Sequence, residues 1–412
     1  MTSERIEEYI QKCKNYIYEN INLNITSDDD LQNKVEELVE EMTANEYISI
    51  EDRVLMVQRV YSSIRGLGML DTIIRDESIT EVMINGPEDV FVEKSGALYK
   101  LEDKFESEER LEDIVQKIVG TAGREVNQAN PIVDTRLPDG SRVNVVLPPI
   151  SLNGAIVTIR RFSKTPMTVE QLIKYGSITP EIADILKIFV KSKFNIFIGG
   201  GTGSGKTTFL NAISNFIPHD ERVITIEDSA ELQIAGIDNL VRLETRNANA
   251  SGCGAITIRD LIKSSLRMRP ERIVVGEVRG GEALDMLQAM NTGHDGSLST
   301  GHANSTKDML SRLETMVLQG AEGLPLEAIR QQIASAIDII IFLSRLRDKS
   351  RKTMEITEVV GYEKGEIILN PLYVFEEDEN STVEKVSGSL KRTDNPLKNT
   401  FKLQLAGVKT KI

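Results

Sequence analysis

Apolar residues in the first 65 positions recur every three or four residues, which is the spacing of one face of an α-helix. One such stripe runs through residues 6–17, a second through 31–42 and a third through 54–64. Ser27 and Ser49 stand just before the second and third stripes, where a hydroxyl can cap a helix N-terminus. The pattern predicts a bundle of three amphipathic helices over residues 1–65.

After Gly66 and Gly68 the apolar pattern changes to short strands. These are expected at 82–85, 90–92 and 97–99, on either side of the turn at 138–141, and at 155–162. Ser107 is placed to cap a helix that carries apolar residues from 111 to 119. Residues 66–165 are therefore expected to form a compact α+β domain.

The second half of the chain alternates between strand-sized apolar runs and helical stretches. Residues 166–175 have the composition of a linker, and Thr179 with Pro180 then opens a helix. Over residues 176–345 the alternation predicts a parallel sheet with crossover helices. Residues 346–412 are expected to add strands and a basic tail. From Lys385 onward we expect either a solvated extension or a segment that docks on a membrane surface or partner.

Residues 195–208 read NIFIGGGTGSGKTT, an apolar strand that enters a glycine-rich turn. The spacing Gly200-x4-Gly205-Lys206-Thr207 is that of a phosphate-binding loop. Its backbone N–H groups point at phosphate oxygens, and the next helix adds the positive end of its dipole. Lys206 then reaches the β- and γ-phosphates, while the Thr207 hydroxyl holds Mg²⁺. The predicted nucleotide contacts are Gly201, Thr202, Gly203, Ser204, Gly205, Lys206, Thr207 and Thr208.

Hydrolysis needs a carboxylate near the terminal phosphate, and two strand ends supply candidates. The first strand, at 223–227, delivers Glu227 and leads to Glu231. The second, at 272–275, leads to Glu277 and resembles a Walker B strand with Gly276 in place of the usual aspartate. Glu277 is therefore expected to polarise the attacking or metal-bound water and to reach Mg²⁺, directly or through water. Ligands bind at the carboxyl ends of strands in open α/β sheets, which supports both candidates.

Residues 292–304 bring two of the three histidines into one glycine-rich segment. Ser297–Thr300 reads as a strand, and its polar end, Gly301-His302, is expected beside Glu277 in a parallel sheet. His302 would there sense the γ-phosphate or link it to the next element.

Composition narrows the class of protein further. A net charge of −14, no tryptophan and 5% aromatic residues argue against a protein that coats nucleic acid. Cys13 and Cys253 fit a reducing compartment and are too few for a cysteine-rich metal site. No run approaches the roughly 18 apolar residues of a membrane span, and the N-terminus lacks the features of a signal peptide. We expect a cytoplasmic location.

Four motifs occur in the order found in the secretion and pilus-assembly ATPase superfamily. They are the loop at 200–207, the acidic box at 227–231, the Gly-Glu strand end at 276–277 and the paired-histidine box at 292–302. The segments 137–144, 158–162 and 258–270 resemble the tight-adherence branch, the CpaF/TadA family of Flp pilus ATPases. The similarity spans about residues 66–345, and the N-terminal helices are also similar. Many type II secretion and type IVa pilus relatives carry a four-cysteine module, which two distant cysteines cannot build. Archaellum and type IV secretion ATPases also lack it, so they stay open.

The resemblance implies an α/β fold with a RecA-like P-loop motor domain, preceded by a small α+β, PAS-like domain and a helical bundle. It also implies a homo-hexamer that binds ATP and Mg²⁺ between the second domain and the motor domain. Such a motor drives inner-membrane platform proteins that add pilin to a fibre, so its membrane contact is peripheral and it needs no direct nucleic acid.

The resemblance also implies roles for residues outside the loop. Arg142 and Arg160 match the arginines that the smaller domain contributes, with Arg136 and Arg161 as neighbouring candidates. Arginine suits phosphate because its planar fork stays charged. Glu231 is implied close to the attacking water, and the choice between it and Glu277 as general base stays open. Arg279 is implied to relay the nucleotide state to the subunit interface.

Other function classes are weaker alternatives. A RecA-type nucleic-acid motor would share the sheet and loop, but it predicts a basic, aromatic-lined strand path that an acidic chain does not offer. A GTP-dependent switch needs Asn-Lys-x-Asp after the loop, whereas Asn33-Lys34-Val35-Glu36 precedes the loop and ends in Glu. A nucleotide-binding regulator without turnover is disfavoured because both acidic strand ends are intact.

Overall fold

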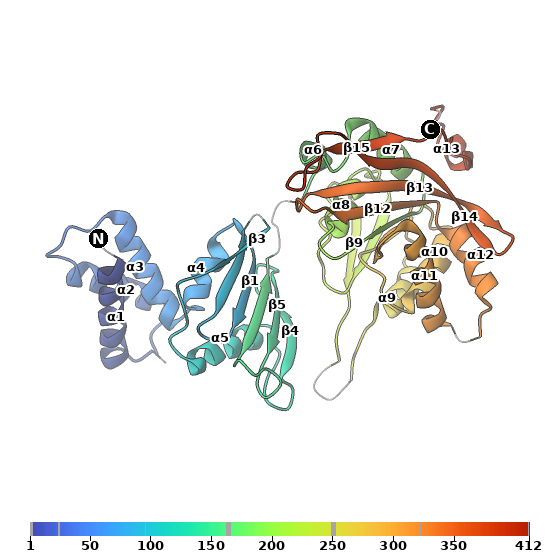
Figure 1. Ribbon diagram of the computed structural model, residues 1–412. Helices are drawn as coiled ribbons and strands as arrows, with labels where there is room; N and C mark the ends of the chain where they lie inside the picture. Colours follow the sequence, from blue (N-terminus) through green and yellow to red (C-terminus); the bar gives the residue numbers. More distant parts are fainter. Residues whose placement is uncertain are drawn as a thin grey trace. The chain divides into compact units, whose positions relative to one another are not determined.

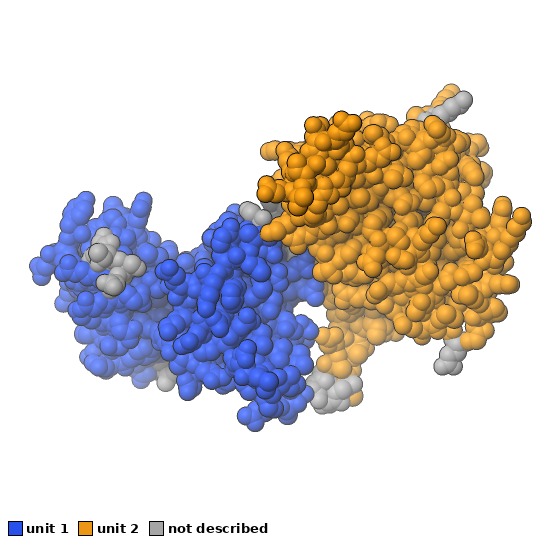
Figure 2. All heavy atoms as spheres, in the orientation of Figure 1, with its two compact units in different colours: residues 1–163 blue, residues 164–412 orange. Residues whose placement is uncertain are grey.

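The computed structural model describes residues 3–23, 25–94, 96–161, 166–248, 253–321, 323–410 and 412. The chain divides into two compact units, Met1–Ser163 and Lys164–Ile412 (Figure 2). Across these described ranges, every helix is too short or too polar to pass through a bilayer.

Unit 1 begins with three helices, α1 (Ser3–Asn20), α2 (Asp28–Met42) and α3 (Ile50–Ile64) (Figure 1). The Ser27 hydroxyl accepts the N–H of Asp30 at 3.1 Å, and the Ser49 hydroxyl accepts the N–H of Asp52 at 3.0 Å. Both predicted N-caps are therefore confirmed. The apolar stripes pack against one another in a core of their own, formed by Ile6, Ile10, Cys13, Ile17, Leu31, Val35, Leu38, Val39, Ile48, Met56 and Val60.

The rest of unit 1 is a six-stranded antiparallel sheet in the order β3-β2-β1-β6-β5-β4. Its strands are β1 (Ile79–Asn85), β2 (Val90–Lys94), β3 (Ala97–Lys100), β4 (Ile132–Arg136), β5 (Arg142–Val146) and β6 (Ile156–Arg160). Helices α4 (Met69–Arg75) and α5 (Glu108–Thr121) complete the unit. Buried and less buried residues alternate along β5 and β6, so one sheet face packs on α5 while the side chains of the other face are partly or fully exposed. The expected strands formed, α4 was not expected, and Phe162 lies outside the described residues.

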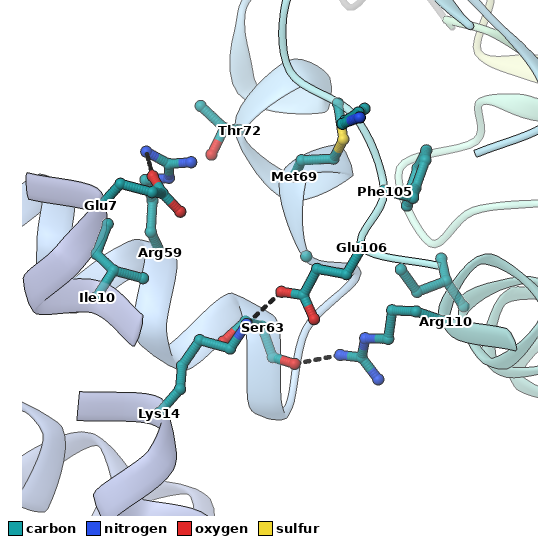
Figure 3. A pocket seen from close by; sticks show the side chains of 13 residues that line it. Glu7, Ile10, Lys14, Arg59, Ser63, Met69, Thr72, Phe105, Glu106 and Arg110 are labelled. Carbon is teal, nitrogen blue, oxygen red and sulfur yellow. Dashed lines mark hydrogen bonds and ion pairs between the residues drawn. The ribbon is translucent and has the colours of Figure 1, made fainter. Parts of the chain in front are cut away.

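Helix α5 and the segment before it fasten the helices of unit 1 to its sheet (Figure 3). Arg110 donates to the carbonyl of Ser63 near the end of α3, and Lys117 donates to the carbonyl of Arg65. The buried Lys14 of α1 pairs with Glu106, and both residues line a cavity of about 120 Å³. Cations that bind the last carbonyls of a helix also interact favourably with its dipole. These contacts account for the bundle and the sheet forming one compact unit.

Unit 2 is built on a nine-stranded sheet in the order β15-β14-β13-β12-β7-β11-β10-β8-β9. The strands are β7 (Ile196–Gly200), β8 (Arg222–Glu227), β9 (Asn239–Glu244), β10 (Arg272–Val275), β11 (Leu298–His302), β12 (Ile339–Arg345), β13 (Arg351–Glu363), β14 (Glu366–Glu377) and β15 (Gly388–Arg392). From β9 to β12 every neighbouring pair is parallel, which confirms the predicted parallel sheet. Strand β9 was not predicted, and β13 to β15 extend the sheet in antiparallel fashion.

Helices cover both faces of this sheet. They are α6 (Val169–Lys174), α7 (Pro180–Lys191), α8 (Lys206–Ser214), α9 (Ile258–Ser265), α10 (Glu282–Asn291), α11 (Thr306–Gly320), α12 (Leu326–Ala336) and α13 (Phe401–Leu405). In β7, Ile196 and Ile198 join the core formed with α6, α7 and α8, whereas Phe197 joins the core formed with α9 to α12. A strand alternates its side chains between faces, so the fully apolar β7 is buried on both sides.

The segment expected as a linker is partly helical. Within residues 166–175, α6 begins at a capping box in which Thr168 and Gln171 bond each other's backbone. Six helical residues are too few for a clear apolar stripe, so the capping pair was the available signal. Residues 162–165 lie outside the described residues.

The basic tail from Lys385 is folded, so the expectation of a solvated extension was wrong. It forms β15 and α13, and Leu397, Leu403 and Ile412 enter the core of unit 2. Two carboxylates far upstream, the buried Glu358 and the half-buried Asp338, hold it. Glu358 accepts the N–H groups of Lys398 and Asn399, and Asp338 lies 2.6 Å from the ammonium of Lys402.

Candidate nucleotide-binding site

The predicted phosphate loop lies between β7 and α8. Gly203 and Gly205 have φ values of +71° and +92°, which residues with a side chain rarely adopt. Helix α8 begins at Lys206 directly after Gly205, so its first N–H groups open onto the loop. Loop amides and the positive end of a helix dipole together form a cradle for phosphate. Thr202 and Gly203 are exposed, Gly201, Gly205, Thr207 and Thr208 are half-buried, and Ser204 and Lys206 are buried.

Lys206 is held inside this loop. Its ammonium donates to the carbonyl of Gly201 at 3.0 Å and lies 3.3 Å from Nδ1 of His302. The hydroxyl of Ser204 donates to the same carbonyl at 2.8 Å. Burial lowers the pKa of Lys206, while the nearby charge of Glu277 opposes that shift. A partly desolvated ammonium on the loop itself is well suited to bind a phosphate.

The carboxyl ends of four parallel strands bring the predicted chemistry together. Gly200 of β7 pairs with His302 of β11, and Val275 of β10 pairs with both Ser299 of β11 and Ile226 of β8. Lys206, His302, Glu277 and Glu227 therefore follow or end neighbouring strands at one edge of the sheet. The expectation that His302 lies beside Glu277 is confirmed, because Nε2 of His302 is 2.7 Å from Oε1 of Glu277.

Glu277 is the centre of a chain of polar contacts. Arg279 donates to its Oε2 through Nε at 2.9 Å and through Nη2 at 2.6 Å. Burial and the nearby cations Lys206 and Arg279 lower the pKa of His302, with Glu277 acting in the opposite direction. When the imidazole is neutral, its Nδ1 can accept from Lys206, and its Nε2 lies against Oε1 of Glu277. The contacts thus run from Lys206 through His302 and Glu277 to Arg279.

Glu227 has a different environment at the neighbouring strand end. It is 3% exposed, and its Oε1 accepts the backbone N–H groups of Glu231 and Leu232, both at 2.8 Å. Burial raises the pKa of Glu227 to about 7, and these hydrogen bonds act against the rise. A Cβ on Gly276 would lie 2.9 Å from Cγ of Glu227. This close packing explains why a glycine stands where a Walker B strand usually has aspartate.

The acidic box is also tied to the loop helix. Asn211 of α8 donates to the carbonyl of Glu231 at 3.2 Å and accepts the N–H of Gln233 at 2.7 Å. Glu231 is half-buried, and Nη1 of Arg279 lies 3.8 Å from Oδ2 of Asp228. The loop helix, both acidic strand ends and Arg279 therefore form one connected site.

The residues fit a nucleotide with Mg²⁺ better than a metal ion alone. Clusters of three or more His, Cys, Asp or Glu side chains that could hold a metal are absent from the part of the chain that the structure describes. Mg²⁺ is usually held by one or two protein groups together with substrate phosphates and waters. Thr207 lies in the first turn of α8, and Glu277 follows β10 at the same edge of the sheet.

In unit 1 the predicted arginines form a row. Arg136, Arg142 and Arg160 are direct partners across β4, β5 and β6, so their side chains lie on the same sheet face. Glu81 of β1 continues the row beside Arg160. Arg161 has another role, because it follows β6 and donates to the carbonyls of Asp76 and Ile79, the latter at 3.2 Å. The row thus places three positive charges and one carboxylate side by side on this face.

The sequence pattern that defines the family described as "Type II/IV secretion system protein" matches residues 64–391. The chain belongs to this type II/IV secretion family. It is 34% identical over 301 residues to a putative conjugal transfer protein of Mycobacterium tuberculosis, covering 72% of this chain and 85% of that protein. It is also 34% identical over 292 residues to the type IV secretion system protein VirB11 of Brucella suis, covering 65% and 81% of the two chains.

Two solved structures share the fold of this family member. The Legionella pneumophila ATPase DotB superposes with a TM-score of 0.51 at 22% identity, over 70% of this chain and 79% of that chain. The pilus retraction motor PilT with bound ADP gives 0.50 at 16% identity, over 82% and 86%. The expected α/β fold is confirmed at this level.

Sequence reasoning missed contacts to the loop in this family member. Nε of Arg351, at the start of β13, donates to the carbonyl of Gly203 at 2.9 Å, and Asn211 links the loop helix to the acidic box. The basic run at 345–352 was visible in the sequence, but no motif connects it with the loop far upstream. His294 precedes β11, at the end opposite His302, and its Nδ1 lies 3.0 Å from the carbonyl of Pro270.

Proposed function

We propose that this chain is an ATP-hydrolysing motor of the type II/IV secretion family that works as a homo-hexamer. The observation that carries the proposal is the chain of contacts from Lys206 through His302 to Glu277, at the strand edge beside the phosphate loop. A cation for phosphate and an acid for water are thereby linked at one place. A RecA-like motor domain in unit 2 and a PAS-like domain in unit 1 complete the proposed architecture.

ATP with Mg²⁺ supplies a terminal phosphoryl group that can be transferred to water. The loop amides and Lys206 bind the phosphates, and the Lys206 ammonium exchanges its contact with Gly201 for phosphate oxygens. The Thr207 hydroxyl and Glu277, directly or through water, hold the metal. Positioned cations stabilise the charge of the transition state without reorganisation.

Glu277 is proposed to orient the attacking water and to accept its proton. His302 shares contacts with both Glu277 and Lys206, so its position depends on whether Lys206 is engaged by phosphate. Glu231, on the loop that Glu227 and Asn211 hold, is the second candidate base.

The arginine row is proposed to complete the site. Arg142 and Arg160, with Arg136 beside them, would approach the nucleotide when unit 1 closes on a motor domain. A charge supplied across a closing cleft can accelerate phosphoryl transfer by orders of magnitude. Turnover would then depend on closure, which is how hydrolysis could drive movement of a partner.

We propose assembly of a tight-adherence (Flp) type pilus as the process that this motor powers, with inner-membrane platform proteins as partners and peripheral contact with the cytoplasmic membrane. The ordered motifs and a content of only two cysteines support this branch. Type IV secretion or conjugal transfer is the second candidate, because relatives at 34% identity carry those names.

Lys206→Ala tests the proposal. Because the variant removes the cation that binds the phosphates, Mg²⁺-dependent ATP binding and turnover should fall below detection. Binding by calorimetry and phosphate release measure the two effects, and Lys191→Ala, an exposed lysine at the end of α7, is the matched control. Loss of turnover in both variants, or in neither, would contradict the proposal.

A further inference from the structure

Arg351 contacts the phosphate loop, although it starts β13 and lies 148 positions after Gly203 in the chain. Its Nε donates to the carbonyl of Gly203 at 2.9 Å. Its Cδ lies 3.3 Å from the point where a Cβ on Gly205 would stand. Both glycines have the left-handed backbone that shapes the loop. One arginine therefore contacts the loop at both of these turns.

The contact has a direct consequence for phosphate binding. A phosphate loop binds through N–H groups that point inward, so its carbonyls must point outward and find other donors. The Arg351 guanidinium stays charged at any physiological pH and supplies a charge-assisted donor for the carbonyl of Gly203. Arg351 thereby fixes the orientation of the peptide between Gly203 and Ser204.

The backbone of the same strand is tied to another part of unit 2. The Ser177 hydroxyl donates to the carbonyl of Arg351 at 2.7 Å, and the N–H of Thr353 donates to the carbonyl of Ser177 at 3.1 Å. Lys352 donates to the carbonyl of Gly176 at 2.8 Å. Three consecutive residues of β13 thus hold the turn at 175–177, which ends α6.

The position of this turn matters because α6 is the first helix of unit 2. A displacement of the turn moves the start of β13, and the side chain of Arg351 carries that movement to Gly203. The reverse also holds, since a phosphate that reorders the loop must act on the same hydrogen bonds. Coupling of this kind is reciprocal for equilibrium binding.

We propose that Arg351 is a positioning residue of the nucleotide site and that the start of β13 couples the phosphate loop to the turn at 175–177. The inference rests on the proposed nucleotide site and adds a route by which its occupancy reaches the first helix of unit 2. It assigns a function to the hairpin between β12 and β13, which carries the basic run at 345–352 and which no sequence motif explained.

The absence of tryptophan from the chain provides a specific probe. Tyr175, in the coupled turn, is 63% exposed, so Tyr175→Trp places the only tryptophan of the chain there, and it can be excited selectively. We expect its fluorescence to change when Mg²⁺ and a non-hydrolysable ATP analogue bind. Affinity is measured separately, by calorimetry with the same analogue.

In this background Arg351→Met keeps the apolar stem and removes the donor. We expect about five- to tenfold weaker binding, as for loss of a partly exposed charge-assisted hydrogen bond, and loss of the fluorescence change at saturation. Arg351→Lys, which can still donate to Gly203, should restore at least half of the change. Ser177→Ala should leave affinity within about twofold and reduce the fluorescence change, because it cuts only the link to the turn.

Arg347→Met is the matched control. Arg347 lies in the same hairpin, but its guanidinium pairs with Glu377 at 2.7 Å and donates to the carbonyl of Thr382. Both readouts should stay within about twofold of the parent. Equal behaviour of the Arg351 and Arg347 variants would overturn the proposal, and so would analogue binding without any fluorescence change in the parent. Failure of the wild-type protein to bind the analogue would instead overturn the proposed nucleotide site itself.

Discussion

Two glutamates at neighbouring strand ends of unit 2 have opposite surroundings. Glu227 ends β8, is 3% exposed and accepts two backbone N–H groups, whereas Glu277 follows β10 and contacts Arg279 and His302. The strands are adjacent and parallel, so position on the sheet does not distinguish the two acids. The groups that each carboxylate contacts distinguish them. Glu227 holds the loop that carries Glu231, whereas Glu277, the acid that we propose for catalysis, contacts a guanidinium and an imidazole.

Glu277→Gln is the variant with the largest expected effect, and it tests directly whether the two glutamates differ in role. The change keeps the shape of the side chain and removes the proton acceptor, so we expect kcat to fall about 100-fold or more while ATP affinity stays within about threefold. Steady-state phosphate release and calorimetry measure the two quantities. A variant that retains more than about a tenth of the turnover would transfer the role of base to Glu231.

The arginine row extends the comparison to unit 1. If Glu277 acts on water while arginines stabilise the phosphoryl charge, Arg142→Ala and Arg160→Ala should each lower kcat about tenfold to 100-fold with little loss of ATP affinity. Arg161→Ala is the contrasting variant, because its contacts are to backbone carbonyls. It should lower the melting temperature of unit 1 and have only a small effect on turnover. Unchanged rates in both row variants would exclude the proposed role.

His302→Ala sharpens the comparison by removing the neutral partner of Glu277. We expect about a tenfold fall in kcat, since the acid loses the imidazole that lies against its Oε1, and affinity within about threefold. Titration of ATP turnover separates the two effects. An equal loss of affinity and turnover would show that His302 serves binding and not the acid.

Glu227→Gln should change turnover least, by less than about fivefold, because Gln can still accept the N–H groups of Glu231 and Leu232. Its effect is on stability. The raised pKa of Glu227, about 7 in the folded chain, means that the wild-type protein loses stability as pH rises from about 4.5 through 7. Gln cannot ionise. Between pH 5 and pH 8 the free energy of unfolding of the variant should therefore rise relative to that of the wild type, by at most about 3 kcal/mol. Melting temperatures of the variant and the wild type at pH 5 and pH 8 measure this change. A difference between the two proteins that is the same at both pH values would contradict the prediction.

Short-range patterns predicted the centre of the site well. The loop motif predicted the position of Lys206, and the rule that parallel strands end at one edge predicted that His302 lies beside Glu277. These features need only strand order and local glycine geometry. The N-caps at Ser27 and Ser49 were predictable for the same reason, because each involves residues three positions apart.

The features that were missed depend on contacts between distant segments. The sequences around Glu227 and Glu277 look alike, and only the packing of the acidic loop buries the first. Arg351 reaches Gly203 from 148 positions away. The tail is basic by composition, yet Leu403 is buried and Lys402 pairs with Asp338, both of which require the folded sheet. Periodicity cannot encode such partners.

Because Glu227 lies close to Gly276, the residue at each of these positions limits which residues the other can hold. A side chain at 276 meets Cγ of Glu227 at 2.9 Å, so aspartate could return to its usual place only alongside a smaller residue at 227. Either exchange alone leaves crowding or a cavity at this contact, and both destabilise a packed core. Among homologous sequences, positions 227 and 276 should therefore vary as a pair, and a lineage that exchanges one should have exchanged the other.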